Sequence, residues 1–187
     1  MASDVEICNL AMNRLGQDPI TSLADDSKRA SLVNTSYARI RDEMLTGYVW
    51  GFARKRVNLA PNAIPPAFIT DYSNAFDLPG DYLALESLGD YTQDYLIEGG
   101  QILSNANPLP LRYVARVTDP NLMSPLFRKC FGLQLAVDLC KALTGDSTLK
   151  EAIQQELRHD LAMARTSDAQ SEGDGRLPED TWLLVRG

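Results

Sequence analysis

Carboxylates are the first residues whose types and spacing could carry chemistry. They are dense in the middle of the chain: Asp71, Asp77, Asp81, Asp90, Asp94 and Glu98. Paired carboxylates act as acid and base in sugar hydrolysis, and clustered carboxylates bind calcium. Their spacing matches no calcium-loop signature, so a solvated acidic face is the simpler interpretation. Such a face would also repel the phosphates of nearby DNA.

Other catalytic groups give weaker signals. The one histidine, His159, lies beside Asp160 in a helical pattern, where neighbouring positions point in different directions. No serine stands in a GxSxG elbow and no glycine loop ends in GK[ST]; Gly173-Asp174-Gly175 precedes no helix or strand pattern. We therefore expect a surface histidine, no catalytic residues, no cofactor and no bound metal.

A basic triplet, Arg54, Lys55 and Arg56, is the most prominent group that could recognise a partner. It follows three aromatic residues, which we interpret as core packing because aromatic rings bury large areas: Tyr48, Trp50 and Phe52. The triplet has two interpretations. It meets an acidic surface on a partner, or it is a solvated strand edge whose charges discourage unwanted pairing.

Two helices are expected ahead of this junction, over residues 4–15 and 27–46. Ser3 and Glu6 match a capping box, and Gly16 supplies a left-handed stop. The apolar stripe of the first helix is Ile7, Leu10 or Ala11, and Leu15. The stripe of the second is Ala30, Val33, Tyr37, Ile40 and Met44.

A β module is expected over residues 52–116, where Pro, Gly, Asn and aromatic residues separate short alternating runs. Gly99-Gly100 fits a two-residue hairpin turn that needs positive φ. The expected strands are Phe52–Leu59, Asn74–Asp77, Leu83–Ser87, Asp94–Glu98, Gln101–Ser104 and Leu111–Arg116.

Two further helices are expected over residues 125–144 and 148–168, as an antiparallel hairpin. Ser124 caps the first, and Thr148 to Glu151 offers a capping box for the second. Residues 171–187 read as a flexible arm with an apolar end that folds back or docks on another chain: Trp182, Leu183, Leu184 and Val185. Leu177, also in the arm, is a further candidate for binding a partner. The predicted fold is α+β: a helical bundle with an inserted small antiparallel β module and an extended C-terminal arm, with residues 1–170 as a single domain.

Composition narrows the function classes. The chain has 187 residues, a formal net charge of -7 and a pI near 4.7, which disfavours a general nucleic-acid binder. No apolar run approaches the length of a membrane span, and the N-terminus lacks signal-peptide features. Cys8, Cys130 and Cys140 form no CxxC pair, which fits a reduced, cytosolic origin without disulfides or zinc.

The order of these segments resembles the tail tubular protein A family, the head-to-tail adaptors of short-tailed and related tailed bacteriophages. The resemblance runs nearly end to end and rests on these segments: ICNLAMNRLGQDPITSLADDS, RDEMLTGYVWGFARKRVNLA, FDLPGDYLALESL, YLIEGGQIL, LRYVARVTD, FRKCFGLQLAVDLCKALTGDS and the trailing tryptophan segment.

The resemblance implies a structural protein without enzyme activity, made in the host cytoplasm and placed in the virion neck between head and tail. Its partners would be the portal protein, a tail nozzle or neck protein, and other copies of itself in a ring, usually of twelve. Genomic DNA would pass through the channel without specific binding.

Two other functions remain open from the residues alone. The acidic residues of the β module could serve a tail-associated hydrolase acting on cell-wall polymers. The chain could also be a transient assembly factor that binds capsid or portal and then leaves.

Overall fold

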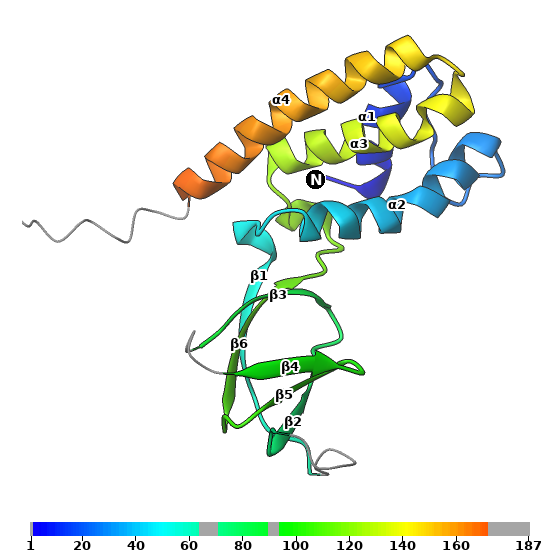
Figure 1. The fold of residues 1–187 in the computed structure, drawn as a ribbon. Coiled ribbons are helices and arrows are strands. Elements are labelled where there is room, and N and C mark those ends of the chain that lie inside the picture. The colour runs from blue at the N-terminus through cyan, green and yellow to red at the C-terminus, as the bar shows by residue number, and fades with distance from the viewer. Residues whose placement is uncertain (1, 64–70, 90–93, 172–187) are drawn as a thin grey trace, which may run out of the picture.

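The computed structural model describes residues 2–63, 71–89 and 94–171. Within them it contains four α-helices, two short 3-10 helices and six strands in two antiparallel sheets. The helices gather at one end of the molecule and the strands at the other (Figure 1). The predicted α+β class and the antiparallel pairing are confirmed.

Helices α1 (Asp4–Arg14) and α2 (Lys28–Thr46) begin at serine caps. The Ser3 hydroxyl accepts a hydrogen bond from the Glu6 amide at 3.1 Å, and Ser27 accepts one from Ala30 at 3.2 Å. Gly16 has the left-handed φ of 63° that ends α1.

Burial shows which residue of each helix occupies two positions of the predicted apolar stripes. In α1, Ala11 is buried whereas Leu10 is 40% exposed. In α2, Leu45 is fully buried, and Met44 is only partly buried against the core. The other predicted stripe residues of both helices are buried: Ile7, Leu15, Ala30, Val33, Tyr37 and Ile40.

Helix α3 (Pro125–Leu143) lies among the other helices and contacts α1, α2 and α4 (Ser147–Ser171). Gly132 lets α1 approach closely, because a Cβ there would lie 2.9 Å from Leu10 Cβ and 3.2 Å from the Ile7 carbonyl oxygen. The expected cap of α4 at Thr148 was wrong. Asp146 accepts hydrogen bonds from the Thr148 and Leu149 amides, at 2.8 and 3.0 Å, so the helix begins at Ser147.

Helix α4 also continues to Ser171, three residues beyond the predicted end at 168. The proposed arm over 171–187 therefore starts within a helix at its first residue. Residues 172–187, with Leu177, Trp182, Leu183, Leu184 and Val185, lie outside the described part of the chain.

The strands form two three-stranded sheets. One has the order β1-β6-β3 and the other the order β2-β5-β4. The bounds are β1 (Arg54–Leu59), β2 (Asn74–Asp77), β3 (Tyr82–Leu88), β4 (Tyr95–Glu98), β5 (Gln101–Ser104) and β6 (Leu109–Ala115). Gly99 and Gly100 have φ values of 57° and 80°, which confirms the predicted β4–β5 hairpin turn.

Strand β6 joins two hydrophobic cores. Val114 packs in the core of the helical end, with Trp50 and Phe127. Leu111 and Tyr113, on the other face of β6, pack in a second core between the sheets. Because successive side chains of a strand point to opposite faces, one strand serves both cores.

Candidate interaction site

Aromatic rings close the helical core where α2 passes into β1. Trp50 is 1% exposed, its ring lies edge-on to Phe127 at 5.0 Å, and its Nε1 donates to the Met44 carbonyl at 3.0 Å. Phe52 also meets Phe127 at 5.0 Å, and Tyr48 meets Trp50 at 4.8 Å. The interpretation of these three rings as packing is confirmed. Phe52 lies in a 3-10 helix (Gly51–Ala53) and so precedes β1.

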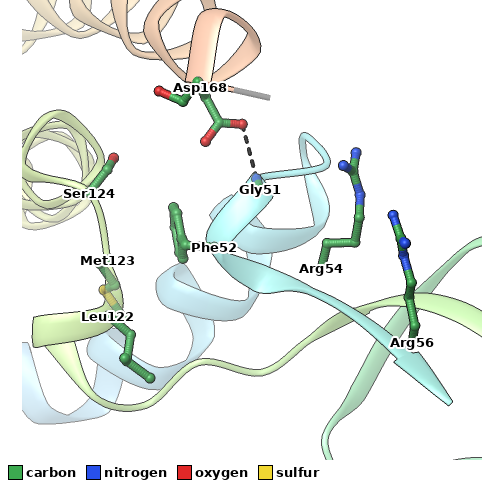
Figure 2. A pocket seen from close by; sticks show the side chains of 9 residues that line it. Gly51, Phe52, Arg54, Arg56, Leu122, Met123, Ser124 and Asp168 are labelled. Carbon is green, nitrogen blue, oxygen red and sulfur yellow. Dashed lines mark hydrogen bonds between the residues drawn. The ribbon is translucent and has the colours of Figure 1, made fainter. Parts of the chain in front are cut away.

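The end of α4 is tied to this junction. The Gly51 amide donates to Asp168 Oδ2 at 3.0 Å, drawn as a dashed line in Figure 2. Arg165 lies over the Tyr48 ring, with its Cζ 5.5 Å from the ring centroid. These two contacts fix the last turns of α4 against the start of β1.

Lys55 is separated from its two basic neighbours. Alternate residues of a strand lie on opposite faces, so Arg54 and Arg56 share a face that Lys55 does not. Lys55 Nζ donates to Asp81 Oδ2 at 2.6 Å, and the Tyr113 hydroxyl donates to Asp81 Oδ1 at 3.0 Å. The bond from Lys55, followed by the bond from Tyr113, holds the pKa of Asp81 below its usual range against the opposing effect of burial.

Arg54 is held within the sheet. Its Nε donates to Glu86 Oε2 at 2.8 Å, and the side chains are 23% and 17% exposed. Arg54 on β1 and Glu86 on β3 are separated by β6, so the pair spans all three strands of the sheet.

Arg56 has a different environment. It is exposed and lies directly opposite Arg112 of β6, a residue that the sequence did not single out. Neither arginine has an ion pair or side-chain hydrogen bond within residues 2–63, 71–89 and 94–171. Like charges directly opposite each other on adjacent strands are unfavourable. The pair therefore favours an anionic partner.

An open pocket of about 710 Å³ lies beside this arginine face. Figure 2 draws its lining, which combines the cationic side of β1 with an apolar wall and the end of α4: Gly51, Phe52, Arg54, Arg56, Leu122, Met123, Ser124, Asp168 and Ser171. Leu122 is 62% exposed. Such a mixed, open lining suits a protein segment better than a small molecule, which usually requires an enclosed pocket.

A second exposed surface lies on β4. Tyr95, Leu96 and Ile97 are 44%, 45% and 40% exposed, and β4 is an edge strand among the residues that the structure describes. Consecutive apolar residues on an exposed edge are unusual, because they invite pairing with another chain.

Asp77 and Asp81 have separate partners in the described part of the chain. Asp77 accepts hydrogen bonds from Asn62 and Gln101, at 3.0 and 2.8 Å, and Asp81 is paired with Lys55. Residues 2–63, 71–89 and 94–171 contain no group of three or more His, Cys, Asp or Glu side chains that could hold a metal. His159 is exposed on α4, as expected, and Asp90 lies outside the described residues.

Neither a scan against protein-family models nor a search of curated proteins gave a match to this chain. Among the described residues, none of the helices has both the length and the apolar character needed to cross a membrane.

Proposed function

We propose that this chain is a structural head-to-tail adaptor of a tailed bacteriophage. In this proposal a helical bundle with an inserted β module forms the ring between portal and tail. The arm over residues 172–187 reaches to the portal, and DNA leaves through the channel of the ring. The chain would carry no enzyme activity. The sequence segments that resemble the tail tubular protein A family motivate the proposal.

The observation that carries it is the Arg56 and Arg112 pair. Two opposed arginines, Arg56 exposed and Arg112 half-buried, have no acidic partner in the described residues, and their repulsion weakens the isolated subunit. An acidic surface on another protein would offset that cost. Because the chain itself has a net charge of -7, further copies of it supply such surfaces in any ring.

The same charge argues that DNA is not the bound partner. A protein that binds DNA needs a basic surface to release counterions, and one arginine pair on an acidic protein is a weak substitute. A conduit for DNA, by contrast, benefits from a surface that repels phosphate.

The test is assembly with the portal protein encoded by the same phage genome. We expect the purified chain to join portal rings in a fixed ratio, measured by native mass spectrometry, and to be present at that ratio in purified virions. A transient assembly factor would be missing from virions, and a hydrolase would release sugars from cell-wall polymers. Either result would overturn the adaptor proposal.

Charge reversal tests the arginine pair. We expect Arg56→Glu with Arg112→Glu to reduce ring formation by at least about tenfold at moderate salt, because attraction to the acidic partner becomes repulsion. The matched control is Lys28→Glu with Arg158→Glu, which makes the same charge change at exposed helical positions. Equal assembly by both variants would show that the arginine pair is not part of the interface.

Deletion tests the arm. Removing residues 177–187 is expected to leave a folded chain, judged by circular dichroism, that no longer joins portal rings. Substituting Trp182, Leu183, Leu184 and Val185 together by serine should have the same effect if burial of the apolar end anchors the arm. Normal assembly by the truncated chain would contradict the docking role.

A further inference from the structure

Two strand edges of this chain are open within the described residues and differ in character. Strand β1 is an edge of one sheet, and β4 is an edge of the other. Most of β1 is exposed, including Val57 at 37%, and all of β4 is exposed. An exposed edge presents unpaired backbone groups that another strand can pair with.

Proline determines which backbone groups of β1 face outward. Asn58 lies opposite Pro110 of β6, and proline has no amide hydrogen, so these residues form a non-hydrogen-bonded pair. The Pro110 carbonyl accepts from Gly89 at 2.8 Å, on the β3 side, which agrees. Because the two kinds of pair alternate, the backbone groups of Arg54, Arg56 and Asn58 point away from β6.

The hairpin turn determines which backbone groups of β4 face outward. Glu98 and Gln101 close the two-residue turn at Gly99-Gly100 and so form a hydrogen-bonded pair. Alternation then directs the backbone groups of Tyr95 and Ile97 away from β5. Each edge therefore offers amides and carbonyls at every second residue.

Charge makes the two edges complementary. Arg54, Lys55 and Arg56 begin β1, whereas Asp94 and Glu98 flank the three apolar residues of β4. In the register that overlaps β4 fully with a second β4, Asp94 is set against Glu98 twice. Antiparallel pairing of β1 with a second β1 sets basic residues against one another in the registers centred on Lys55 or Arg56. Like charges in opposed positions disfavour both arrangements.

We propose that β4 of one subunit pairs antiparallel with β1 of a second copy of this chain, so that the two sheets continue across the subunit boundary. This inference rests on the proposed ring and identifies the contact between neighbouring subunits in it. Because the two edges are different surfaces, the contact is head-to-tail, which generates a ring when the rotation closes.

The outward backbone groups select the register. With Arg56 opposite Ile97 and Asn58 opposite Tyr95, Val57 faces Leu96 and Lys55 faces Glu98. The other register that matches two pairs of outward residues sets Val57 against Asp94 and Lys55 against Leu96. The first register pairs apolar with apolar and basic with acidic side chains, and it is the one that the structure favours.

Engineered cysteines test this register. Val57 and Leu96 would form a non-hydrogen-bonded pair with Cα atoms about 4.5 Å apart, a separation that a disulfide spans. We expect a mixture of Val57→Cys and Leu96→Cys chains to give covalent dimers under mild oxidation. A chain carrying both substitutions should give a ladder of oligomers. The native cysteines do not interfere, because all three are 0% exposed.

Matched controls exclude random collision. Met163 is 52% exposed on α4, so Val57→Cys mixed with Met163→Cys should give at least about tenfold less dimer. Circular dichroism of each variant verifies that the fold is kept. Cross-linking is measured on the chain alone at high concentration and on the chain assembled with portal rings.

Three results would overturn the pairing. The first is dimers from Leu96→Cys alone, which indicate that β4 pairs with itself. The second is no cross-link with or without portal rings. The third is a cross-link that appears only after residues 177–187 are deleted, which indicates that the arm covers the edge in the intact chain.

The pairing and the adaptor proposal can fail separately. Wild-type chain that joins portal rings, while the cysteine variants assemble without cross-linking, refutes the strand pairing and retains the adaptor. Cross-linked oligomers of a chain that never joins portal rings support the pairing and refute the adaptor.

Discussion

Asp81 receives hydrogen bonds from two strands, β1 and β6, through Lys55 and Tyr113. The same contact acts on the tyrosine, since burial, followed by the bond to Asp81, raises the pKa of Tyr113 to about 12. Asp81 follows Gly80 in the turn ahead of β3, so one carboxylate links the turn to the whole β1-β6-β3 sheet.

Acid should weaken this link. The pKa of Asp81 is lower in the folded chain than its usual value, so its contribution to stability is complete above the usual value and is lost as pH falls through the folded value. We expect the unfolding free energy of wild type to fall more steeply than that of Asp81→Asn between about pH 5 and about pH 2. Urea unfolding at each pH measures it. Lys55→Met, which removes the largest cause of the shift, should flatten the profile similarly, and unchanged slopes would contradict the assignment.

Gly132 is a residue whose missing side chain matters. Gly132→Ala should lower the unfolding free energy by about 1–3 kcal/mol, because its Cβ would meet the Ile7 carbonyl and Leu10 Cβ across the α1–α3 contact. Urea unfolding measures the loss. Gly80→Ala is the control, since a Cβ there meets no atom within 4 Å. If both variants were equally stable, the close approach of α1 to α3 would be wrong.

At the scale of elements, the last turns of α4 depend on a side chain that the sequence did not indicate. Asp168→Ala should cost about 0.5–1.5 kcal/mol, since the Gly51 amide loses its acceptor. Hydrogen exchange should report faster exchange at Gly51 and in the last turn of α4. Asp168→Asn retains an acceptor oxygen and should stay closer to wild type. Unchanged exchange at Gly51 in Asp168→Ala would show that the bond contributes nothing.

Local signals explain why most elements could be predicted from the sequence. Ser3 and Ser124 cap helices through bonds to amides three residues later, and Gly99-Gly100 needs only its own dihedrals to turn a hairpin. Where two local signals competed, the prediction failed. Asp146 displaced Thr148 as the cap of α4, and Phe52 joined the aromatic core in a 3-10 turn before the strand could begin.

The candidate site was only partly predictable for a related reason. Arg56 was visible in the basic triplet, but its partner Arg112 lies on β6, and their register depends on sheet pairing between distant segments. The separation of Lys55 from Arg54 and Arg56 required knowing which face of β1 meets Asp81. Nothing in the local sequence carries that information, because it is fixed by long-range packing.

At the scale of the whole molecule, the two hydrophobic cores share strand β6, so we expect the helices and the sheets to unfold together. Val114 belongs to the helical core and Leu111 to the sheet core, so separating them would expose apolar surface of one strand on both faces. In a Trp182→Phe chain, fluorescence reports Trp50 alone. Its urea transition should coincide with the loss of protection of β5 amides in hydrogen exchange. Two separate midpoints would indicate two domains in place of one.

The bond between Gly51 and Asp168 also has a mechanical consequence. The described part of α4 ends at Ser171, about one helical turn after Asp168, and Gly51 begins the 3-10 helix that precedes β1. A pulling force applied at the end of α4 is therefore transmitted through this bond to the residues that precede β1. These residues lie beside the edge proposed to join neighbouring subunits. Tension on α4 would therefore act on the lateral contact of β1 and, through Trp50 and Phe52 on either side of Gly51, on the helical core at the same time.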